Sequence, residues 1–594
     1  MAEGKKKASL KRPKRVRLQD FTCIEDPHPY GCLPGGNRFF GTPSSSSPKS
    51  TDVSKRKAED VFDDKVWQQI ISFCDGCSFG RLVQSSRYLY VVGHQPELWR
   101  DQVLRKCDAE KLVISRVGPS WKDTYVRMFH DKNHRNNNSD NNSSKNETET
   151  DGASAYRPHR PMRMPNVYSD DIYRSHLCRS FAIPPAWLKS QDASTEGTQQ
   201  HWHREVDNIA VDDLNAETFF ANYEEKNQPV VVSGAANGSA VEKWKEWDYL
   251  TSKNTKDSYR STSGAAPLPG NFSLEAYRDY TVSTRYLEES PLYLFDRTAF
   301  ASNREWGDDF FPDFYEKCPY WDPSGEFGHD MLQYLGEKER PDHTWVIMGP
   351  KRSGSVFHID PNATHAWNAC IRGRKRWIFY PPGQPPPGVF PSADGDEVAL
   401  PLSVGEWIIQ YWKEHTEQYR KRPVDQRPME CTTHPGDVVF VPHGWWHSVV
   451  NLDDSNIAIT HNYVSPSNLG NALKFFVEKQ DQISGCRDRK ESIKPEYIHG
   501  ELVKALAIKE PDHLNRAMKQ TGWTCRAWEE TPKSDETVIT DDDEHSSSSN
   551  KNRNKRKIDS VQGGNEQGTN KAEELPTSVM SKTEKVPAFS FSFL

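Results

Sequence analysis

The 594-residue chain lacks an apolar run long enough to span a bilayer, and its N-terminus is basic rather than signal-like. We therefore expect neither a membrane-spanning helix nor a secretory leader. Its eleven cysteines show no framework spacing, which is typical of a reducing compartment. Cys74 and Cys77 form a C-x-x-C pair, but no second pair follows at the spacing of a zinc site. We interpret them as ordinary helix-end or loop cysteines.

Apolar residues are also scarce. The hydrophobic content is 35% and the charged content 27%, which indicates that part of the chain does not fold. The Asn/Ser-rich segment 129–155 and the polar tail 529–594 are predicted to be disordered, as is most of the basic region 1–56. The length of the remainder suggests more than one domain.

Three basic clusters stand out in a chain whose net charge is −7. They run from Lys5 to Arg17, from Lys55 to Lys57 and from Lys551 to Lys557. Such runs are typical of nuclear import signals or nucleic-acid patches, although a solvated tail explains each of them equally well. Their number favours the nucleus. Outside the tails, the chain lacks the interleaved aromatic and basic residues of a dedicated single-strand binder.

Residues 57–128 predict a small all-α module. Phe62, Val66, Ile70 and Phe73 recur at the spacing of an amphipathic helix. An LVQSSR segment and a closing Leu-Trp-Arg follow, and this order resembles an F-box, with Val61-Phe62 where the pattern has Leu-Pro. The resemblance implies docking of a Skp-type adaptor through an apolar helix face. The alternative is a helical cap that packs on the next domain.

Two strand-like stretches carry the candidate metal ligands. The first, Thr344 to Pro382, contains His358 and Asp360, and alternate residues of a strand point to one face. The second, His434 to Leu452, contains His447 and a Pro-Gly pair that suits a type II turn. Two histidines and one carboxylate on one face of a metal form the facial triad of non-heme Fe(II) oxygenases.

The segments RSGSVFHIDPNATHAWNACIRGRKRWIFYPP and PGDVVFVPHGWWHSVVNLDDSNIAITHNYVS resemble the Jumonji-C (JmjC) oxygenases. The nearest branch is that of the phosphatidylserine-receptor-like lysyl hydroxylases, also described as arginine demethylases, and the likeness runs from Asp207 to Leu469. It implies an α+β fold with a double-stranded β-helix (a cupin-like jelly roll) and flanking helices. It also implies Fe(II), 2-oxoglutarate and O₂, and it selects His447 as the third metal ligand. The competing histidines are His365, His434, His443 and His461; we expect His443 to be exposed and His461 to face away from Thr460.

Lys375 is the candidate that binds the far carboxylate of 2-oxoglutarate. An inward-pointing lysine in a small barrel is costly unless it binds an anion, whereas Arg374 and Arg376 have the opposite phase and should point outward. The resemblance implies the same role for Lys375 and adds four residues to the co-substrate site. These are Tyr293, Ser355, Asn368 and Thr460. Turn or core hydrogen bonding remains an open alternative for Ser355 and Asn368.

The resemblance implies oxidation of a C–H bond in a lysine or arginine side chain of a protein, with histones and RNA-associated proteins as candidates. Oxidation of an N-methyl group would end in demethylation, and oxidation of a methylene in a stable alcohol. The rival interpretation is an SCF-type F-box adaptor whose barrel serves only recognition. The C-terminal helices could cover the barrel or form a homodimer contact. The predicted boundaries are 1–56, 57–128 (F-box-like), 129–155 (linker), 156–206 (connecting arm), 207–469 (JmjC), 470–528 (helices) and 529–594 (tail).

Overall fold

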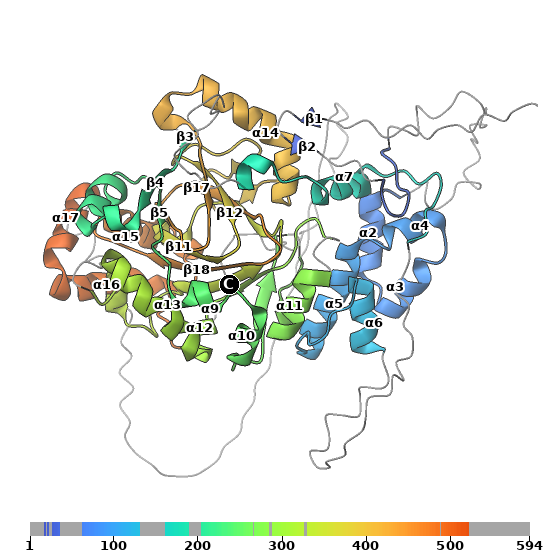
Figure 1. Cartoon of the computed structure of the whole chain (residues 1–594), viewed down its shortest axis with the longest axis horizontal. Helices are drawn as coiled ribbons and strands as arrows, with labels where there is room; N and C mark the ends of the chain where they lie inside the picture. The colour runs from blue at the N-terminus through green and yellow to red at the C-terminus, as the bar shows by residue number, and fades with distance from the viewer. Residues whose placement is uncertain are drawn as a thin grey trace, which may run out of the picture. The chain divides into compact units, whose positions relative to one another are not determined.

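The computed structural model describes residues 17–18, 21–22, 27–35, 62–130, 161–188, 204–264, 266–283, 288–325, 330–487 and 489–521 (Figure 1). Apart from Arg17, the three basic clusters lie outside these residues, as do nearly all of the predicted linker and the whole predicted tail. In the part of the chain that is described, no helix is long and apolar enough to cross a membrane.

Two β-sheets, one of nine strands and one of five, form the centre of the fold. The larger has the order β4 (Asp207–Ala210), β5 (Val230–Ser233), β16 (Val438–Val441), β11 (His365–Arg372), β18 (Asn456–Tyr463), β9 (Thr344–Gly349), β8 (Tyr293–Asp296), β6 (Tyr259–Thr262), β7 (Gly270–Phe272). The smaller has the order β10 (Gly354–His358), β17 (Trp446–Asn451), β12 (Lys375–Tyr380), β15 (Met429–Thr433), β3 (Arg204–Glu205). Two small two-stranded sheets are separate from these. One pairs β1 (Arg17–Leu18) with β2 (Phe21–Thr22), and the other pairs β13 (Phe390–Pro391) with β14 (Val398–Ala399).

Side-chain alternation along the strands builds three apolar layers. On β12, Trp377 and Phe379 enter the core between the two sheets, whereas Ile378 and Tyr380 pack outward beneath α14 (Val404–Lys421). The outer face of the larger sheet is covered by further helices. Strands β12, β16 and β17 are buried at every position, and this is why β12 and β16 contain continuous apolar runs, such as 377–380 and Val438–Val441, instead of alternating apolar and polar residues. The α+β class predicted from the sequence is confirmed.

Short helices fill the connections and cover the outer faces. On the larger sheet and in its connections lie α8 (Ala216–Phe219), a π-helical turn (Phe220–Glu224), α9 (Ser239–Lys243), α10 (Trp247–Ser252), α11 (Leu274–Ser283), α12 (Ala299–Ser302) and α13 (Arg304–Lys317). The 3₁₀ turns are Pro185–Leu188, Val211–Asp213, Pro319–Trp321, Met331–Leu335, Pro361–Ala363, Val424–Gln426 and Gln480–Gln482. The C-terminal helices are α15 (Leu469–Glu478), α16 (Pro495–Lys509) and α17 (Pro511–Thr521). They pack on one another and on the turns at Met331 and Pro361, so they cover the barrel.

Arg374 and Arg376 point away from the interior, as predicted, but Arg376 does not reach solvent. It is 6% exposed, and its Nε donates to Glu430 over 3.1 Å beneath the ring of Trp187. The arm that carries Trp187 and α7 (Asp170–Arg179) lies over this face of the smaller sheet, where it closes the layer under α14. Arg374 forms a bidentate pair with Asp453.

The helical module consists of α2 (Asp64–Ser72), α3 (Gly76–Leu82), α4 (Arg87–Val92), α5 (Pro96–Glu110) and α6 (Trp121–Phe129). Four of these helices begin at Asp or Ser residues whose side chains accept a backbone N–H of the first turn, which offsets the unpaired donors there. The capping residues are Asp63, Asp75, Ser86 and Ser120. Helix α6 extends one residue past the predicted boundary at 128.

The module shares its core with the larger sheet, as Figure 1 shows where the blue helices lie beside α11. Ile114 forms a parallel bridge to Phe272 of β7, and Trp121 contacts the rings of Phe272 and Tyr280. Arg100 pairs with Glu288 over 3.4 Å, and both side chains are at most 1% exposed. One face of the module therefore packs on the larger sheet, as the alternative of a helical cap predicts. These helices do not form a separate domain.

Replacing Trp121 with Ala should lower the free energy of unfolding of the whole protein by about 3–5 kcal/mol, because it opens a cavity in the shared core. Trp121 is fully buried. Urea unfolding, followed by far-UV circular dichroism and tryptophan fluorescence, measures the change. Phe73→Ala, in the same module but 82% exposed, is the control and should stay within about 0.5 kcal/mol of the wild type. A separate early transition of the module that leaves the sheets unaffected would contradict the shared core.

Candidate metal centre

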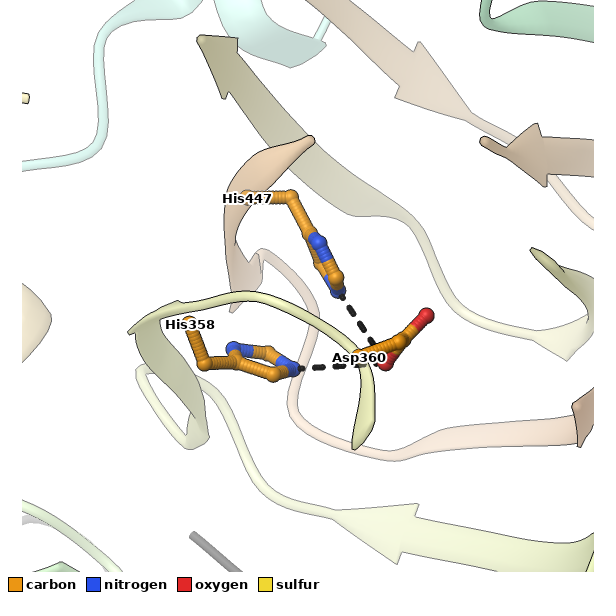
Figure 2. Close-up of side chains that lie close together, drawn as sticks. All are labelled: His358, Asp360 and His447. Carbon is orange, nitrogen blue, oxygen red and sulfur yellow. Dashed lines mark ion pairs between the residues drawn. The ribbon is translucent and has the colours of Figure 1, made fainter. Parts of the chain in front are cut away.

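His358, Asp360 and His447 converge at the end of the smaller sheet (Figure 2). His358 is the last residue of β10, and the antiparallel register places it directly opposite His447 of β17. Their ring centroids are 4.2 Å apart. One oxygen of Asp360, Oδ1, lies 3.9 Å from Nε2 of His358 and 3.8 Å from Nε2 of His447. The three donor groups are close enough to share one ion.

The prediction that His358 and Asp360 lie on one strand is right for the histidine and wrong for the aspartate. Strand β10 ends at His358, and Asp360 precedes a short 3₁₀ turn that begins at Pro361. Proline has no N–H for the ladder and restricts the preceding residue to extended backbone, so the strand cannot continue through this point. The carboxylate reaches the histidines from the turn.

Backbone carbonyls orient both imidazoles. Nδ1 of His358 lies 2.8 Å from the carbonyl oxygen of Val356, and Nδ1 of His447 lies 3.2 Å from that of Trp445. A neutral imidazole that donates from Nδ1 keeps the lone pair of Nε2 for a metal. In both rings it is Nε2 that faces Asp360 (Figure 2).

Burial determines the charge of the three groups. It lowers the pKa of His358 to about 4, helped by the neighbouring His447, and it lowers the pKa of His447 to about 4 as well. Burial raises the pKa of Asp360 to about 6, against the opposing effects of His358 and of a hydrogen bond from Asn462. At neutral pH the site therefore holds two neutral imidazoles and one carboxylate, the donor set of the facial triad.

Lys375 lies in the same cavity, facing the metal candidates from β12. Its side chain is 1% exposed, and its Nζ donates to the hydroxyl of Tyr293 on β8 over 2.9 Å. Among the described residues, no carboxylate lies within ion-pairing distance of this ammonium group. A buried cation without a counter-ion is costly, so the site fits an anionic ligand that accepts from Lys375 and Tyr293.

The cavity brings together all eight residues predicted from the sequence. Its lining includes the three metal candidates and Tyr293, Ser355, Asn368, Lys375 and Thr460. The Oδ1 atom of Asn368 is buried and has no hydrogen-bond partner among the described residues. A buried acceptor of this kind is available to bind a ligand or a water molecule. Thr460 donates its hydroxyl to the carbonyl oxygen of Trp367 over 3.0 Å.

The competing histidines lie elsewhere. His461 faces the opposite side of the larger sheet from Thr460, as predicted, where it stacks on Trp367 and lies 3.6 Å from Asp330. The prediction that His443 is exposed is wrong: it is half-buried, and its Nε2 lies 2.7 Å from the amide of Asn471. The other two contact polar groups outside the cavity, His365 near Ser467 and His434 near Asp437.

Sequence reasoning missed Asn462 and the aromatic walls of the cavity. Asn462 follows Thr460 by two residues on β18 and so faces the cavity, where it helps to hold the pKa of Asp360 down. Its amide also donates to Thr364 in the turn after Asp360. The i, i+2 spacing from Thr460 was the signal available for it. Phe295 and Trp345 belong to the cavity only because β8 and β9 pair.

Comparisons with known proteins agree with this geometry. Residues 216–468 match the family described as Cupin-like domain. The chain is 33% identical over 520 residues to the arginine-specific demethylase JMJ22 of Arabidopsis thaliana, a match that covers 86% of this chain and 88% of that protein. This likeness extends beyond the cupin-like residues.

Two further relatives match a little under half of this chain. The chain is 32% identical over 269 residues to the bifunctional arginine demethylase and lysyl-hydroxylase psr-1 of Caenorhabditis elegans, covering 44% of this chain and 62% of that protein. It is 29% identical over 303 residues to the 2-oxoglutarate and iron-dependent oxygenase JMJD4 of Gallus gallus, covering 49% of this chain and 67% of that protein.

Removing one ligand should abolish tight metal binding without unfolding the protein. His358→Ala and Asp360→Ala are each expected to weaken Mn(II) binding more than about 100-fold, because the loss of a ligand exceeds the loss of an outer-shell partner. Isothermal titration calorimetry measures the affinity, and urea unfolding checks the fold. His443→Ala, which removes a histidine outside the cavity, is the matched control. Unchanged affinity in both ligand variants would rule out this site.

Proposed function

This chain belongs to the family of cupin-like JmjC oxygenases, and we propose that it oxidises a lysine or arginine side chain of a protein substrate. It is an Fe(II)- and 2-oxoglutarate-dependent dioxygenase. The observation that carries the proposal is one cavity with two complementary halves. Neutral histidines and a carboxylate lie at one end, and a buried lysine that pairs with no carboxylate of the described residues lies at the other.

His358, Asp360 and His447 would hold Fe(II). Two imidazole nitrogens and one carboxylate oxygen suit this ion, and three ligands on one face leave positions open for the co-substrate and O₂. The carbonyl groups of Val356 and Trp445 keep each ring in the tautomer that the metal needs.

Lys375 and Tyr293 would bind the far carboxylate of 2-oxoglutarate. A charge-assisted pair with Lys375, joined by the hydroxyl of Tyr293, would orient the acid so that its keto-carboxylate end reaches the metal. Asn368 and Thr460 face the space between these ends, where their polar atoms can bind the acid along its length. Ser355 lines the wall of the smaller sheet.

When bound, Fe(II) with 2-oxoglutarate and O₂ supplies the oxidant for a substrate C–H bond, and 2-oxoglutarate leaves as succinate and CO₂. The protein positions the reacting groups and excludes water with the apolar walls formed by Trp377, Val449 and Ile347. If the target carbon is an N-methyl group, the hydroxylated product loses formaldehyde and the reaction is a demethylation. If it is a methylene, the product remains an alcohol. Histones and RNA-associated proteins are the substrates we propose.

A barrel that serves recognition alone fits the site less well. Binding a peptide does not require three metal donors and a buried lysine in one cavity, and each polar group buried there costs stability unless it is used. We therefore place the chemistry in the barrel and any adaptor function in the helical module.

We also propose that the helical module docks a Skp-type adaptor, as its F-box-like order suggests. One apolar stripe of α2 is left uncovered by the shared core: Phe62 is 42% exposed and Phe73 is 82% exposed, with Val66 and Ile70 half-buried between them. The buried residues of α2 are instead Trp67 and Ile71. One side of α2 therefore packs in the module, and its other side exposes apolar side chains that a partner protein can cover, as helix docking requires.

Nuclear localisation and homodimerisation are further proposals. The basic clusters at Lys5 to Arg17, Lys55 to Lys57 and Lys551 to Lys557 support import into the nucleus. On α16, Tyr497 is 48% exposed and Ile508 is 78% exposed, and these apolar side chains support a contact between two copies of the chain.

Lys375→Ala should raise the 2-oxoglutarate concentration required for half-maximal succinate formation by about tenfold or more, because a charge-assisted hydrogen bond is lost. Mn(II) affinity should not change. Succinate formation by the full chain with Fe(II) and ascorbate is the readout, and Lys413→Ala, an exposed lysine of α14, is the control. No succinate from the wild type would refute the oxygenase reaction. An unchanged requirement in the variant would mean that another cation binds the acid.

Phe73→Asp should abolish binding of a purified Skp-type adaptor, because it would bury a charge within an apolar contact. The substitution lies at the surface, so the fold should survive. Pull-down and calorimetry compare it with the wild type and with Ile508→Asp, an equally exposed apolar residue outside the module. Equal binding by the Phe73 variant, or no binding by the wild type, would leave the module as a structural cap only.

A further inference from the structure

A second and larger cavity adjoins the metal centre. Its volume is about 250 Å³, and its lining includes Lys256, Arg260, Arg297 and Asp342. It shares two walls with the metal cavity, Phe295 and Trp345, whose ring centroids are 5.5 Å apart. None of its residues outside these two walls belongs to the metal site.

The register of the larger sheet explains why the two cavities are neighbours. Ile347 of β9 pairs with Phe295 of β8, and the β6 register places Arg260 beside Phe295 and opposite Asn271 of β7. These four side chains form one row on one face of the sheet. The row begins with Ile347 in the metal cavity and ends with Asn271 in the second cavity. A polypeptide lying along this row would contact both.

The far wall of the second cavity is tied to the metal centre. Gly485 and Cys486 form this wall, and the preceding Ser484 exchanges two hydrogen bonds of 3.1 Å with the side chain of Asn362. Asn362 lies two residues after Asp360, in the turn that positions the carboxylate. The carbonyl of Gly485 also accepts the N–H of Asp342. The two cavities therefore keep a fixed spacing.

The lining of the second cavity is cationic. It contains three basic side chains, Lys256, Arg260 and Arg297, against two carboxylates. Both carboxylates are already paired: Asp296 with Lys256, and Asp342 with Arg297 and with the nearby Arg489. With Arg489 counted, four basic side chains therefore surround two carboxylates, and their net positive field extends into the cavity.

We propose that this cavity holds an anionic side chain of the protein substrate, a carboxylate or a phosphate, next to the residue that is oxidised. The inference rests on the proposed function and specifies its substrate. A lysine or arginine that enters the metal cavity past Phe295 and Trp345 passes close to this net positive charge and is repelled by it. A neighbouring anion on the same polypeptide turns this repulsion into attraction, which selects basic target residues with an acidic or phosphorylated neighbour.

The test uses direct binding, which does not depend on turnover. Fluorescein-labelled peptides carry a central lysine or dimethylarginine in a Gly/Ser background, with Glu, phosphoserine or Gln at each nearby position in turn. Fluorescence anisotropy measures their affinity for the full chain loaded with Mn(II) and 2-oxoglutarate. At one position or more, the wild type should bind the Glu or the phosphoserine peptide about tenfold more tightly than the Gln peptide. The stronger of the two identifies carboxylate or phosphate.

Arg260→Gln should remove this preference and leave the affinity for the Gln peptide unchanged. Arg297→Gln, at the solvent-facing side of the cavity, is a second variant in case the first fails to fold. Arg372→Gln on the same sheet, whose guanidinium stacks on Trp247 outside both cavities, is the matched control and should keep the preference. Equal affinities of the wild type for all three peptides, or a preference that survives in Arg260→Gln and Arg297→Gln, would overturn the proposal.

Succinate formation by the same proteins, with Fe(II) and ascorbate in place of Mn(II), separates the two hypotheses. Succinate without any anion preference overturns the second cavity as a substrate site and leaves the oxygenase reaction intact. Anion preference without succinate supports the cavity as an anion site and overturns the oxygenase reaction.

Discussion

The pairing of β10 with β17 is the constraint on which the site depends. It sets His358 opposite His447, and the turn that Pro361 forces after β10 brings Asp360 to the same point. A slip of one residue in this ladder would turn one histidine to the other face of the sheet. The apolar core between the sheets holds the register, because a one-residue shift of β17 would also turn Val449 out of this core.

The interior of the barrel contains polar groups that a purely structural core would avoid. A lysine, an aspartate and two histidines share a small cavity in which each is at most one-tenth exposed. Their protein partners include carbonyl and hydroxyl groups and the amide of Asn462, and these satisfy only part of their bonding capacity. A metal ion and a dicarboxylic acid complete the set, since the ion takes the nitrogens and the carboxylate while the acid takes the ammonium group. Site and ligands are thus complementary in charge.

The helical module and the row of Ile347, Phe295, Arg260 and Asn271 lie on opposite faces of the same sheet. On the outer face, Ile114 and Trp121 close the core over β7, and Arg100 pairs with Glu288 just before β8. On the inner face, β9, β8, β6 and β7 carry this row, which includes Arg260. A sheet that forms one wall of a binding surface must be rigid. The module packs on the outer face at β7 and so stabilises this edge of the larger sheet.

The sequence by itself determined the chemistry and the class of fold. The H-x-D pair and Lys375 are recognisable because metal and anion binding require those residue types, and alternation along β12 predicted which of its side chains face inward. His447 was selected among several histidines by the resemblance to the JmjC oxygenases. The strand ends, the half-burial of His443, the contribution of Asn462 and the packing of the module were decided only by the tertiary structure. The physical reason is that these features depend on pairing between segments distant in the chain: β8 with β9 and β6, and α6 with β7 and α11. Local periodicity shows which face of an element is apolar, but only the assembled fold shows what covers that face.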